Sequence, residues 1–119
     1  MAKVTQKITP FLWFEEGAED AANYYISVFK NSKIRHIQKY PEAAEEVSGQ
    51  KAWSVMSVHL ELDGMNFQFL NGGKIPQFDL NSSAISFVVT CDTQEEIDNF
   101  WEKLNCGLSF QLFGVFQLQ

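Results

Sequence analysis

The sequence predicts an α+β domain made of two β-α-β-β-β modules, the second of which is shortened. An apolar strand followed by an amphipathic helix occurs twice at a constant spacing, and further strands with a tight hairpin follow the first pair. The chain ends before a second set of strands could be completed. Its 119 residues, 45% of them hydrophobic, suit one domain with its own core. We expect a single domain over residues 1–119, with module one at about 7–73 and module two at about 83–119.

The first strand and helix lie between residues 8 and 30. Residues 8–14 are apolar and rich in aromatic side chains, with Pro10 near the start, which predicts a strand that begins at a sheet margin. Apolar residues then recur at helical spacing, so residues 17–30 are expected to form an amphipathic helix. The recurring positions are Ala18, Ala21, Ala22, Tyr25 and Phe29.

Three further strands complete the first module. Residues 32–40 resemble a strand, and the polar, acidic residues 41–51 are expected to form a loop. Residues 54–62 alternate strictly between apolar and more polar side chains, the pattern of a strand with one buried face. Its expected buried side chains are Met56, Val58, Leu60 and Leu62. Asp63-Gly64 is a strong two-residue hairpin signal, and residues 65–70 form the return strand.

The second module begins with another strand and helix. Residues 73–83 read as a connector, and residues 84–91 form an apolar strand. Thr93 and Glu96 have the spacing of a capping box, which starts a helix by pairing two side chains with free backbone N–H groups. The apolar face of this helix is expected at Ile97, Phe100, Trp101 and Leu104.

The two strand–helix segments match without a gap at an offset of 76, which is 84 minus 8. Polarity and bulk agree over about twenty positions, which indicates an internal repeat. The matched pairs include Phe11 with Phe87, Leu12 with Val88, Glu16 with Asp92, Glu19 with Glu95, Asp20 with Glu96, Asn23 with Asn99, Tyr24 with Phe100, Tyr25 with Trp101 and Val28 with Leu104.

The second module cannot be completed at this offset. Its third element is expected near residues 108–116, and its final hairpin would need positions beyond 119. Three explanations are open: a natural abbreviation, strands supplied by a partner chain, or an incomplete or altered C-terminus. Because an open sheet edge invites pairing with another chain, we favour a homodimer.

Composition and charge limit the class of protein. The net charge is −6 and no basic stripe interrupts it, which argues against a nucleic-acid partner. The start of the chain has no secretion signal, and no apolar run is long enough to span a membrane. Cys91 and Cys106 fit neither a disulfide framework nor a zinc ribbon, so we expect reduced thiols and a cytoplasmic location. Eleven Phe and three Trp fill a core or line a pocket for an apolar or aromatic ligand.

Several short motifs carry a family resemblance. They are ITPFLWF (8–14), AEDAANYY (18–25), FKNSKI (29–34), HLELDG (59–64), FLNGG (69–73), AISFVV (84–89), TQEEI (93–97) and WEKL (101–104). Together they resemble the PhnB-like family, also called 3-demethylubiquinone-9 3-methyltransferase-like. This family belongs to the glyoxalase, bleomycin-resistance and extradiol-dioxygenase (vicinal oxygen chelate) superfamily. The resemblance covers about residues 7–104. Beyond it, either residues 108–112 or residues 113–117 could stand for the family's final strand.

The resemblance implies a cupped mixed sheet around a pocket, often with a divalent metal held by His and Glu. The four superfamily ligand positions fall on Pro10, Ser86, Gln68 and Gln117 (or Gln111). Proline offers no side-chain donor, and serine and glutamine are weak donors for such an ion. The sequence therefore predicts that the standard metal site is absent and that no cofactor is bound.

Two histidines are the remaining candidates for metal chemistry. His59 and Glu61 share one face of a strand and could bind a metal, but two ligands on an exposed strand make a poor site. We interpret His59 as part of a polar face or as a hydrogen-bonded histidine. His36 stands alone in the sequence and receives the same interpretation.

The sequence contains no cofactor motif that would support the methyltransferase activity in the family's name. An adenosine-based methyl donor usually needs a Gly-rich turn between a strand and a helix. Asn71-Gly72-Gly73 ends a hairpin and opens no helix, so this activity is not expected.

Two functional classes therefore remain, and whether the chain is an enzyme stays open. One is a metal-free protein that binds a small apolar, aromatic or amphipathic molecule. The other is a lyase, isomerase or dioxygenase relative that uses a metal through unusual ligands such as His59 and Glu61. A domain that only dimerises is a third possibility if no pocket remains. The expected ligand-binding residues are Pro10, Leu12, Phe14, His59, Gln68 and Ser86, with Phe11 and Trp13 packed under the helix by strand alternation.

Overall fold

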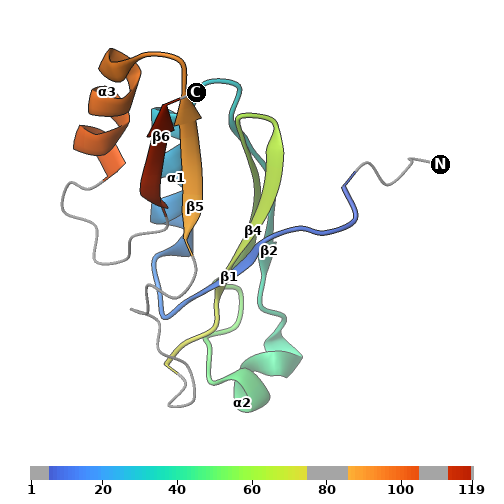
Figure 1. Cartoon of the computed structure of the whole chain (residues 1–119). Helices are drawn as coiled ribbons and strands as arrows, with labels where there is room; N and C mark the ends of the chain where they lie inside the picture. Colours follow the sequence, from blue (N-terminus) through green and yellow to red (C-terminus); the bar gives the residue numbers. More distant parts are fainter. Residues whose placement is uncertain (1–5, 75–85, 105–112, 119) are drawn as a thin grey trace. The chain divides into compact units, whose positions relative to one another are not determined.

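The computed structural model describes residues 6–74, 86–104 and 113–118 of the chain. The chain divides into two compact units, Met1–Phe78 and Asp79–Gln119, each with its own sheet and helix. Figure 1 shows the elements along the chain. The α+β fold class predicted from the sequence is confirmed.

The first unit contains a four-stranded mixed sheet and one long helix. In chain order its elements are β1 (Phe11–Phe14), α1 (Ala18–Val28), β2 (Lys33–Lys39), β3 (Val55–Leu62) and β4 (Met65–Asn71). The strands lie in the order β1-β4-β3-β2. β1 pairs with β4 in parallel, and the other two pairs are antiparallel. The predicted β-α-β-β-β module is therefore present.

The connection between β2 and β3 is not the plain loop that the sequence predicted. It contains a 3₁₀ turn, η1 (Glu42–Ala44), and one helical turn, α2 (Glu45–Ser48). Gly49 ends this turn with a φ of 74°, a value at which glycine avoids the strain of a Cβ atom. The apolar residues of this segment, Ala43, Ala44 and Val47, are too few and too small to mark an amphipathic helix in the sequence.

The hairpin between β3 and β4 turns at Asp63 and Gly64, as predicted. Both residues have positive φ, 50° and 80°, which is the backbone of a type I′ turn. This turn matches the twist of the flanking strands and places Leu62 opposite Met65. It thereby fixes the register of the whole β3–β4 pair.

The core of the first unit lies between α1 and one face of the sheet. Tyr25, on the buried side of α1, packs edge-on against Phe69 with ring centroids 6.1 Å apart. Phe69 also contacts Phe14, at 4.9 Å between centroids. Three of the four apolar positions of β3 are buried as the alternation predicted, and Met56 is only partly buried. The buried apolar residues of β1, β3 and β4 are Phe14, Val58, Leu60, Leu62, Phe67 and Phe69.

The predicted orientation of β1 is wrong. Leu12 pairs with Phe69, and Phe14 packs on Phe69, so both lie on the side of the sheet that α1 covers. Phe11 and Trp13 therefore lie on the opposite side, and Phe11 is 54% exposed. All four residues of β1 are large and apolar, so the alternation of side chains did not distinguish its two faces.

One asparagine ties the helix to the sheet. Asn71, the last residue of β4, accepts a hydrogen bond through Oδ1 from the backbone N–H of Ala18 (2.8 Å). Its Nδ2 donates to the carbonyl of Val55 (3.1 Å), and its own carbonyl accepts from the hydroxyl of Tyr40 (2.6 Å). Gly17, the N-cap residue of α1, has no side chain for this purpose, so Asn71 satisfies a helix N–H group from outside the helix.

The two glycines that follow β4, Gly72 and Gly73, lie in close contact with Trp13. The indole Nε1 of Trp13 donates to the carbonyl of Gly73 (2.8 Å). A Cβ atom built on Gly72 would overlap the six-membered ring of this indole. Gly72 therefore allows the backbone to pass directly beneath the tryptophan.

The second unit repeats the beginning of the first. It contains β5 (Phe87–Cys91), α3 (Gln94–Leu104) and β6 (Phe113–Leu118). Adding 76 to the bounds of α1, 18 and 28, gives 94 and 104, the bounds of α3, and adding 76 to the start of β1 gives the start of β5. The repeat predicted from the sequence is confirmed.

The shortening of the second unit differs from the prediction. β6 pairs with β5 in parallel, just as β4 pairs with β1, so β6 occupies the place of the module's last strand. Of the two proposed runs, residues 113–117 lie in this strand, and residues 108–112 lie outside the described residues. Eight positions (105–112) separate α3 from β6, whereas 36 positions (29–64) separate α1 from β4. Among the described residues, the module therefore lacks counterparts of β2 and β3, not the final strand.

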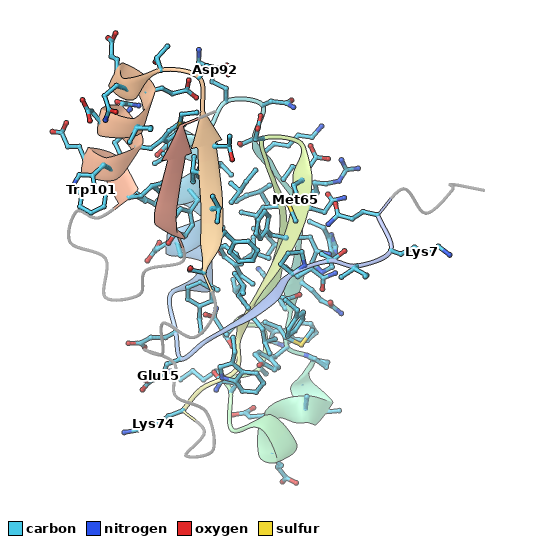
Figure 2. The ribbon with its side chains drawn as sticks, in the orientation of Figure 1. Lys7, Glu15, Met65, Lys74, Asp92 and Trp101 are labelled. Carbon is cyan, nitrogen blue, oxygen red and sulfur yellow. The ribbon has the colours of Figure 1, made fainter. Side chains whose placement is uncertain are left out.

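Side chains at the start of α3 also follow the prediction in part. The hydroxyl of Thr93 accepts the N–H of Glu96 (3.2 Å), the first half of the capping box. Cys91 is a buried free thiol, and burial, reinforced by the nearby carboxylates of Glu96 and Asp92, raises its pKa. Leu104 is buried, but Trp101 is 58% exposed and projects from the helix (Figure 2).

No described helix combines the length and the apolar character needed to cross a bilayer.

We expect replacement of Asn71 to weaken the first unit substantially. Asn71→Leu removes two side-chain hydrogen bonds and leaves the N–H of Ala18 and the carbonyl of Val55 unpaired. The expected loss is about 2–4 kcal/mol in the free energy of unfolding, measured by urea denaturation. Asn23→Leu makes the same chemical change at an exposed position of α1 and serves as the control. Equal losses in the two variants would contradict this role of Asn71.

Replacement of Gly72 tests the contact with Trp13. Gly72→Ala forces a methyl group against the indole and should cost about 1–3 kcal/mol of stability. In a Trp13→Ala background the space is open, so the same substitution should cost much less. A double-mutant cycle by thermal or urea unfolding measures this difference, and additive losses would argue against the contact.

Candidate functional site

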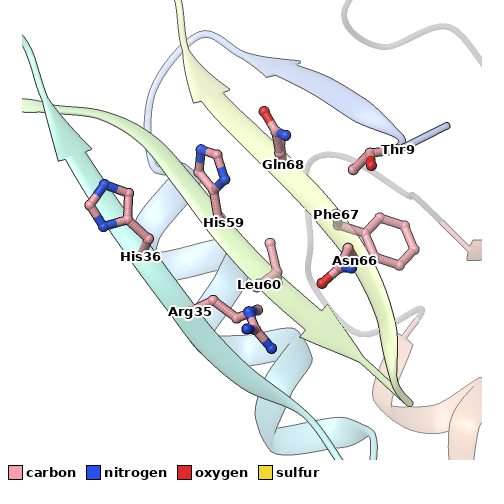
Figure 3. Close-up of a pocket in the computed structure, with 8 residues that line it drawn as sticks. All are labelled: Thr9, Arg35, His36, His59, Leu60, Asn66, Phe67 and Gln68. Carbon is pink, nitrogen blue, oxygen red and sulfur yellow. The ribbon is translucent and has the colours of Figure 1, made fainter. Parts of the chain in front are cut away.

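The face of the sheet opposite α1 carries polar side chains from three neighbouring strands. The register pairs His36 of β2 with His59 of β3, and His59 with Gln68 of β4. Directly paired residues point to the same side of a sheet, so these three side chains stand in one row. Figure 3 shows the row across the three strands.

A pocket of about 330 Å³ lies on this face, entirely within the first unit. Its lining combines two imidazoles, two carboxamides, a hydroxyl and a guanidinium with parts of two core residues. The lining residues are Thr9, Arg35, His36, His59, Leu60, Asn66, Phe67 and Gln68 (Figure 3). This set of donors and acceptors on a concave surface is typical of a small-molecule site.

An ion pair occupies one side of the pocket. The pairing of β2 with β3 shifts between Ile34 and His36, which leaves Arg35 as the extra residue of a β-bulge. The Arg35 guanidinium forms an ion pair with the carboxylate of Glu61. The Glu61 carboxylate is therefore neutralised by Arg35 and is a poor candidate for the metal ligand that the sequence suggested.

The two histidines lie next to each other. Their ring centroids are 5.7 Å apart, and the rings are inclined by 74°. Burial lowers the pKa of His59 below its usual value of 6.5, and the nearby charge of His36 lowers it further. His59 therefore favours the neutral imidazole, with one ring nitrogen free to accept a proton or bind a ligand. His36 stands alone in the sequence, but the strand pairing brings it opposite His59 on this polar face.

The structure unites only part of the predicted site. His59 and Gln68 both line the pocket. The carbonyl of Pro10 accepts the N–H of Gln68 (2.9 Å), so Pro10 lies beside the pocket through its backbone. Leu12 and Phe14 lie on the side of the sheet that faces α1, away from this pocket.

Ser86, the remaining residue that was expected to bind a ligand, belongs to the second unit. It is exposed and immediately precedes β5. Four further lining residues were not predicted from the sequence: Thr9, Arg35, His36 and Asn66. Asn66 lies two positions before Gln68 on the same strand, so the alternation of side chains could have predicted it as a lining residue. The positions of Arg35 and His36 depend on a bulge that no sequence pattern marks.

The other possible metal ligands do not form a cluster among the described residues. Within residues 6–74, 86–104 and 113–118, no three or more His, Cys, Asp or Glu side chains form a group that could hold a metal ion. Gln117 lies in β6 opposite Thr90, and Gln111 lies outside the described residues. The absence of the standard metal site stays a prediction from the sequence.

A β-α-β-β-β unit with a mixed sheet, followed by a β-α-β unit of the same spacing, defines an α+β protein built from an internal repeat. Comparison with known proteins specifies the family. A family model described as 3-demethylubiquinone-9 3-methyltransferase matches residues 6–117, and the chain belongs to this family.

One solved structure supports this assignment. A PhnB protein of Bacillus cereus, provisionally described as a 3-demethylubiquinone-9 3-methyltransferase, is 38% identical to this chain with a TM-score of 0.69. The match covers 83% of this chain and 73% of that protein. A protein of Staphylococcus aureus is 24% identical over 86% of this chain and 69% of its own, with a TM-score of 0.45. No curated protein matches the chain.

The protonation of His59 is directly measurable. A folded-state pKa below the unfolded value means that stability is present above about pH 6.5 and is lost as pH falls below it. We expect the His59 ring signals to titrate below 6.5 in NMR, and the free energy of unfolding to decrease between about pH 7.5 and 5.5. His59→Asn should show a smaller decrease over this range.

His36→Asn tests the second cause of the lowered His59 pKa, which is the charge of His36. It removes the neighbouring positive charge, so the pKa of His59 should rise toward 6.5 while remaining below it because of burial. A pKa of His59 at or above 6.5 in the unsubstituted protein would contradict the assignment.

Proposed function

We propose that this chain is a small-molecule-binding protein of the PhnB-like family that holds a small aromatic or amphipathic ligand without a metal at the standard positions. The observation that carries the proposal is the 330 Å³ pocket in which three strands and the segment before β1 bring hydrogen-bonding side chains together. We place the ligand on the row formed by His36, His59 and Gln68.

The chemistry of the lining suggests what such a ligand contains. A neutral imidazole at His59 and the carboxamide of Gln68 each provide a donor and an acceptor, which suits hydroxyl or carbonyl groups on the ligand. Phe11 is paired with Gln68, points to the same side and is 54% exposed. It offers an aromatic surface beside the pocket for the apolar part of the ligand. An oxygen-substituted aromatic ring combines both features.

The methyltransferase activity in the family's name is not part of the proposal. β4 ends at Asn71, and Gly72 and Gly73 follow in irregular structure beneath Trp13. An adenosine-based methyl donor usually binds where a Gly-rich turn leads into the N-terminus of a helix. The ion pair of Glu61 with Arg35 also disfavours the alternative enzyme that would use His59 and Glu61 as metal ligands.

Two further expectations belong to the proposal. We infer a cytoplasmic protein with reduced thiols, which the buried free thiol of Cys91 supports. We also infer a homodimer, because the second unit has a short sheet with few strands. Membership of the vicinal oxygen chelate superfamily is inferred from the sequence motifs.

The proposal is tested with catechol, a planar ring that carries two adjacent hydroxyl groups. In ¹⁵N NMR titrations we expect saturable shifts of residues in the pocket, with His59 and Gln68 among them. His59→Ala and Gln68→Ala should each weaken binding by roughly tenfold, the effect of about one lost hydrogen bond in a desolvated site. Asp20→Asn, an exposed change on α1, is the control.

Two outcomes would contradict the proposal. One is the absence of saturable shifts with catechol and its methyl ether. The other is binding that leaves the pocket residues unaffected and is unchanged in His59→Ala. A methyl-transfer assay with S-adenosylmethionine should show no product and no binding of the methyl donor.

A further inference from the structure

The chain contains only two histidines, and the fold brings both to the same place. They are 23 positions apart in the sequence (59 minus 36) and lie on β2 and β3, yet they are direct partners across the antiparallel pair. Within the part of the chain that the structure describes, no hydrogen bond engages a ring nitrogen of either residue. Two adjacent imidazoles with available nitrogens are a chelating arrangement.

The separation of the rings fits a shared ion. Two imidazoles bound to one tetrahedral ion, at metal–nitrogen distances of about 2.0–2.1 Å, hold their ring centroids roughly 5 Å apart. The observed centroid separation of His36 and His59 is 5.7 Å. Small rotations of the side chains would close the difference, and His36 is exposed, so its ring has room to turn.

We propose that His36 and His59 form a binding site for a divalent transition-metal ion on the polar face of the first unit. Imidazole nitrogens select ions such as Ni²⁺, Cu²⁺ and Zn²⁺ over Mg²⁺ and Ca²⁺, which prefer oxygen ligands. Gln68 stands next to His59 on β4 and can offer its amide oxygen as a weaker third ligand. The remaining coordination positions open into the pocket.

The electrostatic surroundings permit a cation here. The nearest fixed positive charge, the guanidinium of Arg35, is paired with Glu61. The net charge of the chain is −6, which favours the approach of cations. The site differs from the four positions that the family resemblance assigned to a metal, since only Gln68 is common to both. The ion and the organic ligand proposed above would share His36, His59 and Gln68, but the inference rests on the pairing of the two histidines and not on that ligand.

Titration of the untagged full chain with metal salts tests the inference. In isothermal titration calorimetry, ZnCl₂ should bind with one ion per chain, and MgCl₂ should give no binding. Addition of NiCl₂ should broaden the NMR signals of both histidine rings together. His36→Asn and His59→Asn should each reduce zinc affinity by on the order of tenfold or more, since one of two imidazole ligands is lost.

Two control variants separate the alternatives. Gln38→Ala changes an exposed side chain on β2 and should leave zinc affinity unchanged. Glu61→Gln keeps both imidazoles but removes the ion pair of Arg35, so it should weaken zinc binding less than either histidine variant does. A loss as large as in the histidine variants would overturn the assignment of His36 as the partner of His59. Circular dichroism establishes that each variant is folded.

Further results would overturn the proposal. They are the absence of zinc binding to the unsubstituted chain, unchanged affinity in either histidine variant, and broadening of only one histidine by Ni²⁺. Zinc binding without catechol binding would support this site and remove the proposed function. Catechol binding without zinc binding would do the reverse.

Discussion

The first unit depends on Asn71, whose side chain and backbone carbonyl connect α1, β3 and Tyr40 to the end of β4. This residue satisfies the N-terminus of α1, holds the start of β3 and accepts the hydroxyl of Tyr40 at the end of β2. Each of these groups would otherwise be a polar group without a partner at the edge of the core. By fixing α1 against one face of the sheet, Asn71 determines which side chains are buried and which remain available to a ligand.

The polar face follows from that constraint and from strand pairing. Because α1 covers the side of Val58 and Phe69, the alternate residues His59 and Gln68 must point away from the helix. The type I′ turn at Asp63 fixes the register that places them side by side. The bulge at Arg35 then sets which residue of β2 joins the row. The pocket is thus formed by strand register, with Thr9 added from the segment before β1.

Sequence patterns predicted the structural elements that are marked by local periodicity or by turn residues. The bounds of α1 and α3 differ by the same 76 positions as the sequence repeat, and the hairpin turns where Asp63-Gly64 predicted. The orientation of β1 was not predictable, because Phe11 and Phe14 are equally suited to burial. The pairing of His36 with His59 was missed because it depends on a bulge, and a bulge changes the register by one residue without a clear signal in the sequence. Pro10 and Gln68, two of the predicted site residues, are in contact through the backbone.

The strand order of the first sheet explains how a module can shrink and keep its parallel strand pair. β1 and β4 are neighbours at one end of the sheet, and β3 and β2 follow on the other side of β4, so removal of β2 and β3 leaves the β1–β4 pair intact. The second unit has this reduced form, with β6 beside β5. The row of His36, His59 and Gln68 is built on the strands β2, β3 and β4, and two of these three have no described counterpart in the second unit. Among the described residues, duplication of the module has therefore not duplicated the row of polar side chains that lines the pocket.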